Sequence, residues 1–258
     1  MKKQKIFVFD IDGTLINPKT HKIPESAIQA IDSLKTQGHI IGLATGRNYP
    51  EVTKVLDLKR FDFAIMCNGG YVQVKDKQVF NDSFSLEEKH KVIAEMEKYN
   101  LEYGVMTYED IYALNPDSNK VKRVIEFFDI APPQKKINFD EMAVYQFNIF
   151  ESDNTIPLLS LDKTFIIHSY GHFGYDIALT RITKGHALRK LFSYLAYDLN
   201  DCIAFGDADN DITFLKIAGI GIAMGNASEQ AKANADFITT PVWDDGIYHA
   251  LKHYRFIK

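Results

Sequence analysis

The chain begins with a short apolar run in which apolar and polar positions do not alternate. Residues 6–9 are all apolar, and Asp10, Asp12 and Gly13 follow almost at once. Strands that are buried on both faces show such unbroken runs, as in a parallel sheet covered by helices on both sides. The opening segment therefore predicts a central strand with two carboxylates just beyond its end.

The same pattern returns along the chain and alternates with helical periodicity. Further strands are predicted at 40–44, 64–67, 201–205, 219–224 and 237–240, and helices at 24–38, 50–56, 185–197, 212–218 and 244–254. Asn226 and Glu229 have the spacing of a capping box and predict the start of one more helix. The alternation predicts an α/β protein with a doubly wound, mainly parallel core sheet.

The pattern changes in the middle of the chain. Residues 72–84 are typical of a hairpin, and the segments 101–115, 142–152 and 163–180 alternate apolar with polar positions. Clean alternation is typical of antiparallel strands with one covered face. We therefore expect an α/β unit at 84–180, inserted into a core formed by 1–83 and 181–258.

Composition and charge exclude several classes of partner. The chain has 258 residues, 46% apolar content and a net charge of −4, so its overall field attracts neither nucleic acid nor an anionic membrane. The longest apolar runs are too short to span a bilayer, and acidic residues interrupt the first one, which argues against a signal peptide. Two cysteines lie in apolar runs and are interpreted as core residues, so we expect a cytoplasmic protein. Separately, we expect a monomer or weak homodimer.

Candidate chemistry gathers where the predicted strands end. The polar or small residues at these ends are Asp10 and Asp12, Thr45 and Gly46, Asn68 to Gly70, and Asp207 to Asp211, while Lys184 opens a helix. Ligands of open α/β sheets bind beyond the carboxyl ends of the strands. Two neighbouring carboxylates repel one another and favour a cation between them. The sequence thus predicts one polar, cation-binding site at this edge.

Four of these segments resemble the motifs of one family. DIDGTL at 10–15, Thr45 in LATGR, Lys184 in TRITKG and GDADND at 206–211 are similar to the four motifs of the haloacid dehalogenase-like (HAD) phosphohydrolases, Cof-type subfamily. The insertion is similar to the α/β (C2-type) cap of that family. The resemblance covers essentially the whole chain, and it implies a Mg²⁺-dependent phosphatase that hydrolyses small phosphate monoesters, sugar phosphates first, through an aspartyl phosphate.

The resemblance also implies a role for each acid. Asp10 would be the nucleophile, which splits one difficult displacement into two easier ones. Asp12 would act as general acid and then as general base. Asp10, the backbone carbonyl of Asp12 and Asp207 would hold Mg²⁺, with Asp211 as a further ligand or as a support for the ligands.

Other polar residues would bind the phosphate. Thr45 and Gly46 would donate hydrogen bonds to a phosphoryl oxygen, and Lys184 would supply positive charge. Asn210 would orient Lys184 or the phosphate, and Asn68 would contribute from its own strand end. Arg47 is open between a contact to substrate and an ion pair with an acid.

Two alternative functions stay open. A phosphotransferase or phosphomutase would use the same site with a sugar hydroxyl in place of water, and a regulator would keep the fold without catalysis. The intact acids argue against the regulator, since a binding protein does not require Asp12.

The cap would exclude water and select the leaving group. Its residues His168, Tyr170, His172 and Tyr175 are interpreted as cap residues first and as substrate contacts second.

Overall fold

The computed structural model describes residues 4–128 and 130–258, so the first three residues of the basic start lie outside the described residues. Its contacts divide the chain into two compact units. The first comprises the chain up to Gly46, Asp57–Asn81 and Thr183–Lys258; the second comprises Arg47–Leu56 and Asp82–Ile182. The segment Arg47–Leu56 thus groups with the insertion, because Tyr49 donates a backbone hydrogen bond to Tyr108 (3.1 Å) and their rings lie 5.2 Å apart.

The first unit is built on an eight-stranded sheet of the order β14-β13-β12-β1-β2-β3-β4-β5. Its strands are β1 (Ile6–Phe9), β2 (Ile40–Ala44), β3 (Phe63–Met66), β4 (Tyr71–Val74), β5 (Lys77–Asn81), β12 (Cys202–Gly206), β13 (Ile220–Ala223) and β14 (Phe237–Ile238). The six strands from β14 to β3 are parallel, and the β4–β5 hairpin adds two antiparallel strands. The predicted α/β class with a mainly parallel core sheet is confirmed.

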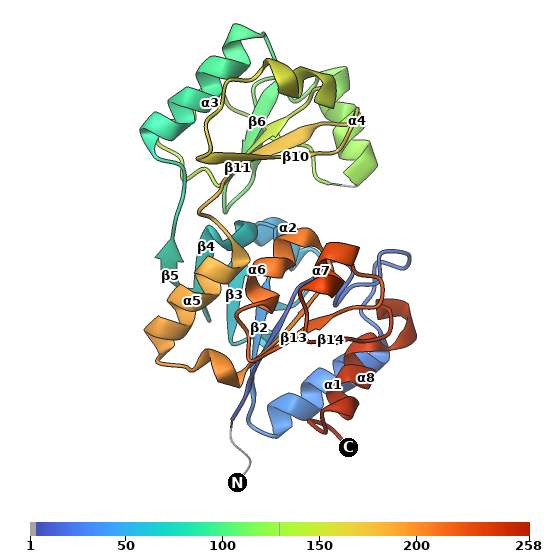
Figure 1. The fold of residues 1–258 in the computed structure, drawn as a ribbon. Helices are drawn as coiled ribbons and strands as arrows, with labels where there is room; N and C mark the ends of the chain where they lie inside the picture. The colour runs from blue at the N-terminus through green and yellow to red at the C-terminus, as the bar shows by residue number, and fades with distance from the viewer. Residues whose placement is uncertain (1–3, 129) are drawn as a thin grey trace. The chain divides into compact units, whose positions relative to one another are not determined.

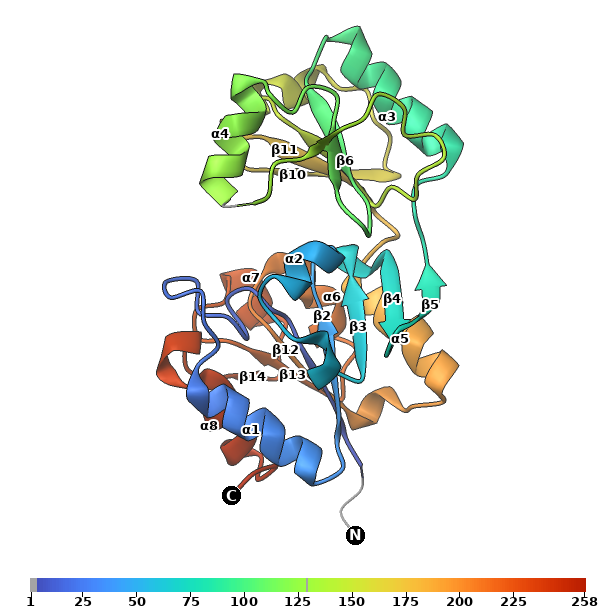
Figure 2. The same ribbon diagram turned by 180° about the vertical axis from the view of Figure 1, so that it is seen from behind.

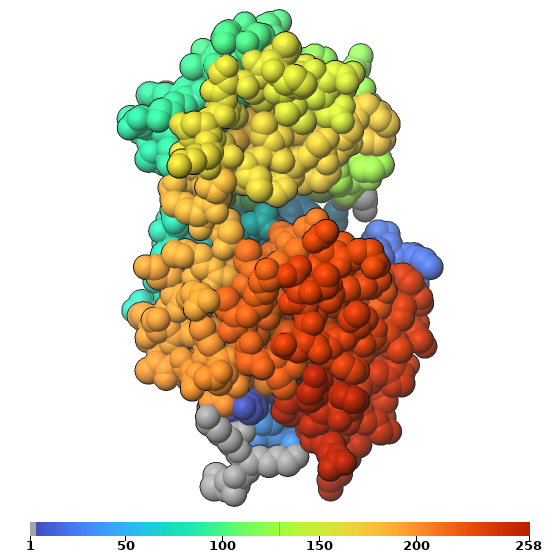
Figure 3. Space-filling view, viewed as in Figure 1, coloured from blue at the N-terminus to red at the C-terminus, as the bar shows by residue number. Residues whose placement is uncertain are grey.

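Helices cover both faces of this sheet (Figures 1 and 2). They are α1 (Glu25–Thr36), α5 (Lys184–Leu195), α6 (Ile212–Leu215), α7 (Glu229–Ala233) and α8 (Gly246–His253). Ile6 and Val8 belong to the buried core under α5 and α6, whereas Phe7 points the other way and packs edge-to-face on Phe256 after α8. This two-sided burial explains the unbroken apolar run of β1. In the space-filling view the C-terminal part of the chain, orange to red, covers much of the visible face of the first unit (Figure 3).

The second unit contains a six-stranded sheet of the order β10-β11-β9-β6-β7-β8, antiparallel except for the β7–β8 pair. Its elements are α2 (Tyr49–Thr53), α3 (Leu86–Lys98), β6 (Tyr103–Met106), β7 (Ile111–Ala113), α4 (Asn119–Phe128), β8 (Gln134–Lys135), β9 (Gln146–Ile149), β10 (Phe165–Ser169) and β11 (Tyr175–Leu179). A capping box between Ser85 and Glu88 starts α3. The alternation predicted for 142–152 is present, but only β9 forms a strand there.

One predicted helix start is wrong. The residue that caps α7 is Ser228, whose side chain accepts from the backbone N–H of Ala231 (3.1 Å). Asn226 lies outside the helix and its side chain bonds to two distant loops instead. No helix within the described ranges is long and apolar enough to cross a membrane.

Candidate active site

The strand order places the ends of β1 and β12 side by side. β1 lies between β2, which follows it in the chain, and β12, which comes almost two hundred residues later, so the order of the strands reverses here. Asp10 follows β1 and donates its backbone N–H to the carbonyl of Phe205 in β12 (2.9 Å). Asp207 is the first residue after β12. The reversal point of a doubly wound sheet is where such proteins bind their ligands.

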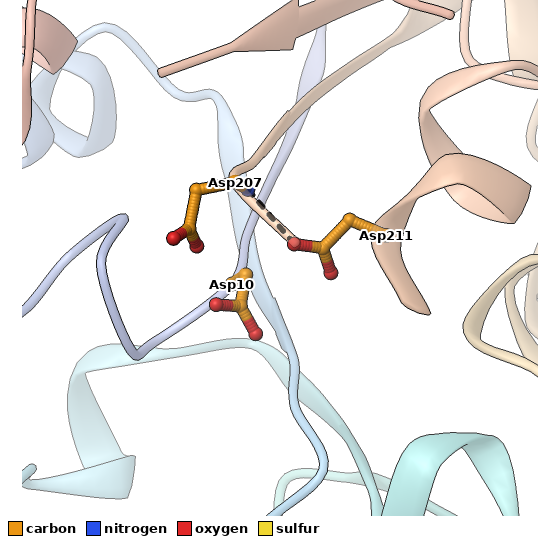
Figure 4. A group of neighbouring side chains, drawn as sticks. All are labelled: Asp10, Asp207 and Asp211. Carbon is orange, nitrogen blue, oxygen red and sulfur yellow. Dashed lines mark hydrogen bonds between the residues drawn. The ribbon is translucent and has the colours of Figure 1, made fainter. Parts of the chain in front are cut away.

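Three carboxylates meet at this point. One oxygen each of Asp10, Asp207 and Asp211 lies within 4.8 Å of the others, and Figure 4 shows the three side chains converging. The second oxygen of Asp211 accepts the backbone N–H groups of Asp207 (2.8 Å) and Ala208 (3.0 Å). Asp211 therefore fixes the loop that carries Asp207.

Lys184 connects two of the acids. Its Nζ donates to Oδ1 of Asp10 and to Oδ1 of Asp211, both at 2.6 Å, and the side chain is 1% exposed. Lys184 stands at the start of α5, where the helix dipole disfavours a cation, so its placement depends on the two carboxylates. Burial alone would lower the pKa of Lys184, but the charges of Asp10 and Asp211 outweigh it and raise that pKa above its ordinary value.

The site has an excess of negative charge. When all three carboxylates are ionised, they outnumber the one ammonium by two charges. Burial, with the charges of Asp211 and Asp207 adding to it, raises the pKa of Asp10, and Lys184 opposes this. Burial, followed by the charge of Asp211, raises the pKa of Asp207 to about 7. Such destabilised carboxylates are the hard oxygen donors that a divalent cation prefers, so the residues present fit a metal ion.

Gly13 allows the first loop to approach this cluster. Its φ is +77°, and a Cβ there would lie 2.1 Å from Oδ2 of Asp207, so a side chain at this position would be strained and would displace the Asp207 carboxylate. The next residue, Thr14, is fully buried and donates its hydroxyl to Oδ1 of Asp207 (3.1 Å). Both residues stand in the segment that was singled out from the sequence, but no role had been predicted for the Thr14 side chain.

Asn226 is the clearest residue that the sequence interpretation missed. Its Nδ2 donates to the carbonyl of Gly13 (2.8 Å) and reaches Oδ2 of Asp207 (3.4 Å), while its Oδ1 accepts from the N–H of Val242 (2.8 Å). It thereby ties three loops together. A signal was present: Asn226 follows shortly after a parallel strand, β13, as the other site residues follow theirs.

The predicted phosphate-binding residues lie at the ends of β2 and β3. Thr45 is 1% exposed, and its carbonyl accepts the backbone N–H of Asn68 (3.0 Å). A Cβ at Gly46 would lie 3.1 Å from Oδ1 of Asn68, so Gly46 makes room for that amide. Asn210 donates to Asn68 Oδ1 (2.9 Å), whereas Lys184 is oriented by Asp211. Asn210 therefore does not contact Lys184 here, and its predicted role toward the phosphate stays a prediction.

Two predicted residues stand apart from the acidic cluster. The side chain of Asp12 is exposed and does not belong to the group of three converging carboxylates. This is compatible with the expectation that only its backbone oxygen approaches a metal. Arg47 belongs to the second unit, where it donates to the carbonyl of Glu51 (3.1 Å) and lies 3.7 Å from the Glu51 carboxylate. The ion pair with an acid is therefore present, and the contact of Arg47 with substrate stays a prediction.

Comparisons with known proteins agree over nearly the whole chain. The family model of haloacid dehalogenase-like hydrolases matches residues 7–251. The chain is 27% identical over 255 residues to pyridoxal phosphate phosphatase YbhA of Escherichia coli (strain K12), which covers 91% of this chain and 92% of that protein.

Solved structures are similar as well. A hypothetical protein of Geobacillus kaustophilus HTA426 has a TM-score of 0.91 at 29% identity, over 99% of this chain and 100% of the other. The HAD subclass IIB sugar phosphatase BT4131 has a TM-score of 0.84 at 30% identity, over 98% and 100%. With the fold and the converging carboxylates, these matches show that the chain belongs to the haloacid dehalogenase-like hydrolases.

Proposed function

We propose that this hydrolase is a Mg²⁺-dependent phosphatase that removes phosphate from small phosphate monoesters through an aspartyl phosphate at Asp10. The observation that carries the proposal is the environment of Asp10. This carboxylate is 5% exposed, is held by Lys184 and lies beside two further acids. Relatives named as pyridoxal phosphate and sugar phosphatases support the substrate class, with sugar phosphates as the first candidates.

Asp10 is suited to attack phosphorus. Lys184 holds Oδ1 in place, which fixes the direction of the carboxylate before substrate arrives. In the first step an Asp10 oxygen forms a bond to phosphorus while the bond from phosphorus to the ester oxygen breaks, and Asp12 gives that oxygen a proton. In the second step water attacks phosphorus, Asp12 takes a proton from it, and the bond to Asp10 breaks to release phosphate.

The acids around Asp10 would hold the cation. Asp10, Asp207 and the backbone carbonyl of Asp12 would be its protein ligands. Asp211 would act through other groups, because both of its oxygens already accept hydrogen bonds from Lys184 and from the backbone of the 207–208 loop. When bound, Mg²⁺ neutralises charge on the carboxylates and on the phosphoryl group, so that two anions can approach one another.

The remaining residues would bind the phosphoryl group and select the substrate. Thr45 and the backbone N–H of Gly46 would donate to a phosphoryl oxygen, and the amides of Asn68 and Asn210 support that strand end. The second unit would act as the cap that selects the organic part of the ester. Nucleic acid and membranes are not expected partners, and a cytoplasmic monomer or weak homodimer completes the proposal. Cys202 is a buried thiol, consistent with a reducing compartment.

Phosphate release from a panel of phosphate monoesters, with and without Mg²⁺, tests the proposal. We expect release only with the metal, and none from Asp10→Asn. Asp12→Ala should lose about 10²–10⁴ in kcat, the usual size of general acid–base catalysis, while Mg²⁺ binding by calorimetry stays unchanged. Asp32→Asn, an exposed acid of the first unit paired with Arg60, is the matched control and should keep full activity.

The results also separate the alternatives. Full activity of Asp10→Asn would contradict the covalent mechanism. A product phosphorylated at a second position, with little free phosphate, would show a phosphotransferase or phosphomutase instead. Binding of phosphate esters without any turnover would show a regulator.

A further inference from the structure

A carboxylate in the second unit lacks a cation. Asp176 in β11 is partly buried; its Oδ2 accepts from the Tyr170 hydroxyl (2.7 Å) and its Oδ1 from Nδ2 of Asn148 (3.0 Å). Within residues 4–128 and 130–258, it forms no ion pair with a lysine, arginine or histidine. A buried charge without a counter-charge is unfavourable, and burial raises the pKa of Asp176 to about 6 in spite of the two hydrogen bonds.

The amide next to this carboxylate has an unused acceptor. Oδ1 of Asn148 is buried and has no hydrogen-bond partner in the described residues. Rotating the amide by half a turn would not help, because it would place this oxygen against the carboxylate of Asp176. The donor side of Asn148 is thus fixed by Asp176, and the acceptor side is left for a group from outside the chain. A buried acceptor of this kind is unfavourable while it stays unpaired.

The two acceptors lie in one row across the sheet. Asp176 is directly opposite Asn148 of β9 on one side and His168 of β10 on the other. Burial lowers the pKa of His168, which disfavours the charged form of this histidine. Asn148 and Asp176 alternate with Phe147 and Ile177, which point into the core of the second unit. The row therefore belongs to the opposite face of the sheet.

Aromatic rings flank the same row. Tyr170, which donates to Asp176, packs edge-to-face on Phe128 at the end of α4, with ring centres 5.2 Å apart. Beside it, Phe127 stacks on Phe173 at 3.7 Å. Tyr170 is 41% exposed and Phe128 is 40% exposed, so both rings are accessible to a ligand. Aromatic faces next to a carboxylate attract organic cations.

We propose that the second unit binds a protonated amine on the organic part of the substrate, with the Asp176 carboxylate and Asn148 Oδ1 as acceptors. This inference rests on the proposed phosphatase function and narrows its substrates to aminated phosphate monoesters. An ammonium group supplies both the missing positive charge and the missing donor, and its protons fit two acceptors on adjacent strands. A hydroxyl group would supply the donor without the charge. A metal ion would require more oxygen ligands than these two side chains provide.

Matched pairs of esters test the proposal on the Mg²⁺-loaded, full-length protein. The pairs are glucosamine 6-phosphate with glucose 6-phosphate, and ω-aminoalkyl with ω-hydroxyalkyl phosphates of two to six carbons, since the length that the site requires is unknown. We expect kcat/KM to favour the amine in at least one pair by roughly tenfold to a hundredfold, the size of one charge-assisted hydrogen bond. Equal rates in every pair, or a preference for the hydroxyl compounds, would overturn the proposal.

Variants locate the preference. Asp176→Asn keeps the shape of the side chain and removes its charge, so it should abolish the preference for amines. Asp162→Asn removes an exposed acid of the second unit and should preserve the preference. A preference that survives in Asp176→Asn would overturn the assignment. The wild-type comparison decides the proposal even where this variant folds poorly.

A binding measurement separates this inference from the proposed function. Calorimetry with the same ester pairs, on wild type and on Asp176→Asn, requires no turnover. Tighter binding of the amines that is lost in the variant supports the site even where no ester is hydrolysed. Equal affinities overturn it even where the protein is an active phosphatase.

Discussion

Replacing Lys184 by methionine tests how the active-site charges are held together. The change keeps the length of the side chain and removes its ammonium group. Asp10 and Asp211, whose side chains are 7% and 0% exposed, are then left without the cation that lies 2.6 Å from each. Because both acids are buried, water cannot replace this partner without opening the site.

The size of the effect follows from these contacts. A hydrogen bond to a charged group contributes about 1.5–3 kcal/mol, so two of them contribute roughly 3–6 kcal/mol. Part of this loss is offset in the variant, because burying methionine carries no desolvation cost of a charge, whereas burying lysine does. We expect the free energy of unfolding without added metal to fall by about 3 kcal/mol. The double variant Lys184→Met/Asp211→Asn should lose less free energy of unfolding than the sum of the losses in the two single variants. With Asn at position 211, removal of the lysine no longer leaves a buried charge unpaired at that position.

Urea unfolding followed by tryptophan fluorescence provides the assay, because Trp243 is the single tryptophan and belongs to the first unit. Lys190→Met is the matched control: it stands on the same helix, is exposed, and should change the free energy by less than about 0.5 kcal/mol. A loss below 1 kcal/mol in Lys184→Met, or strict additivity in the double variant, would refute the view that this lysine neutralises the buried acids.

Three further outcomes are expected. Gly13→Ala should weaken Mg²⁺ binding in calorimetry by more than tenfold, because its Cβ would meet the Asp207 carboxylate at 2.1 Å; unchanged affinity would contradict this packing. Asn226→Ala should weaken Mg²⁺ binding about 10–100-fold with the fold preserved by circular dichroism, as for other residues that support metal ligands, and Asn226→Ser should restore part of it. Asp176 has a folded pKa of about 6, above its unfolded value of about 3.9, so its contribution to stability is full below pH 4 and is lost as the pH rises through 6. Asp176→Asn should therefore be about 2 kcal/mol more stable than wild type at pH 7.5 in urea unfolding and equal to it at pH 4; a pH-independent difference would count against the raised pKa.

The sequence predicted what depends on local pattern and on strand order. The unbroken apolar run before Asp10 indicated a strand covered on both faces, and β1 is buried throughout. Parallel strands expose their carboxyl ends at one edge, so the residues after each run could be grouped without any knowledge of distances. Asp10, Asp207 and Asp211 were brought together in this way, and the family that their spacing resembled is confirmed.

Contacts between segments distant in sequence could not be predicted from such patterns. Asn226 has the local signature of a helix cap, yet its side chain spans to Gly13 and Val242, because three loops converge where β13 ends. Likewise Asn210 was expected to orient Lys184 or the phosphate, and its side chain donates to Asn68, which lies more than a hundred residues away in the sequence.

The boundary between the two units also depends on contacts between distant segments, which local patterns do not reveal. The segment Arg47–Leu56 follows β2 directly and was assigned to the core, although its contacts, such as that of Tyr49 with Tyr108, lie in the second unit. In the second unit itself, the sequence showed that Asn148 and Asp176 alternate with apolar neighbours. Only the pairing of β9 with β11 set these two acceptors opposite each other, because strand register depends on the whole sheet and not on either strand alone.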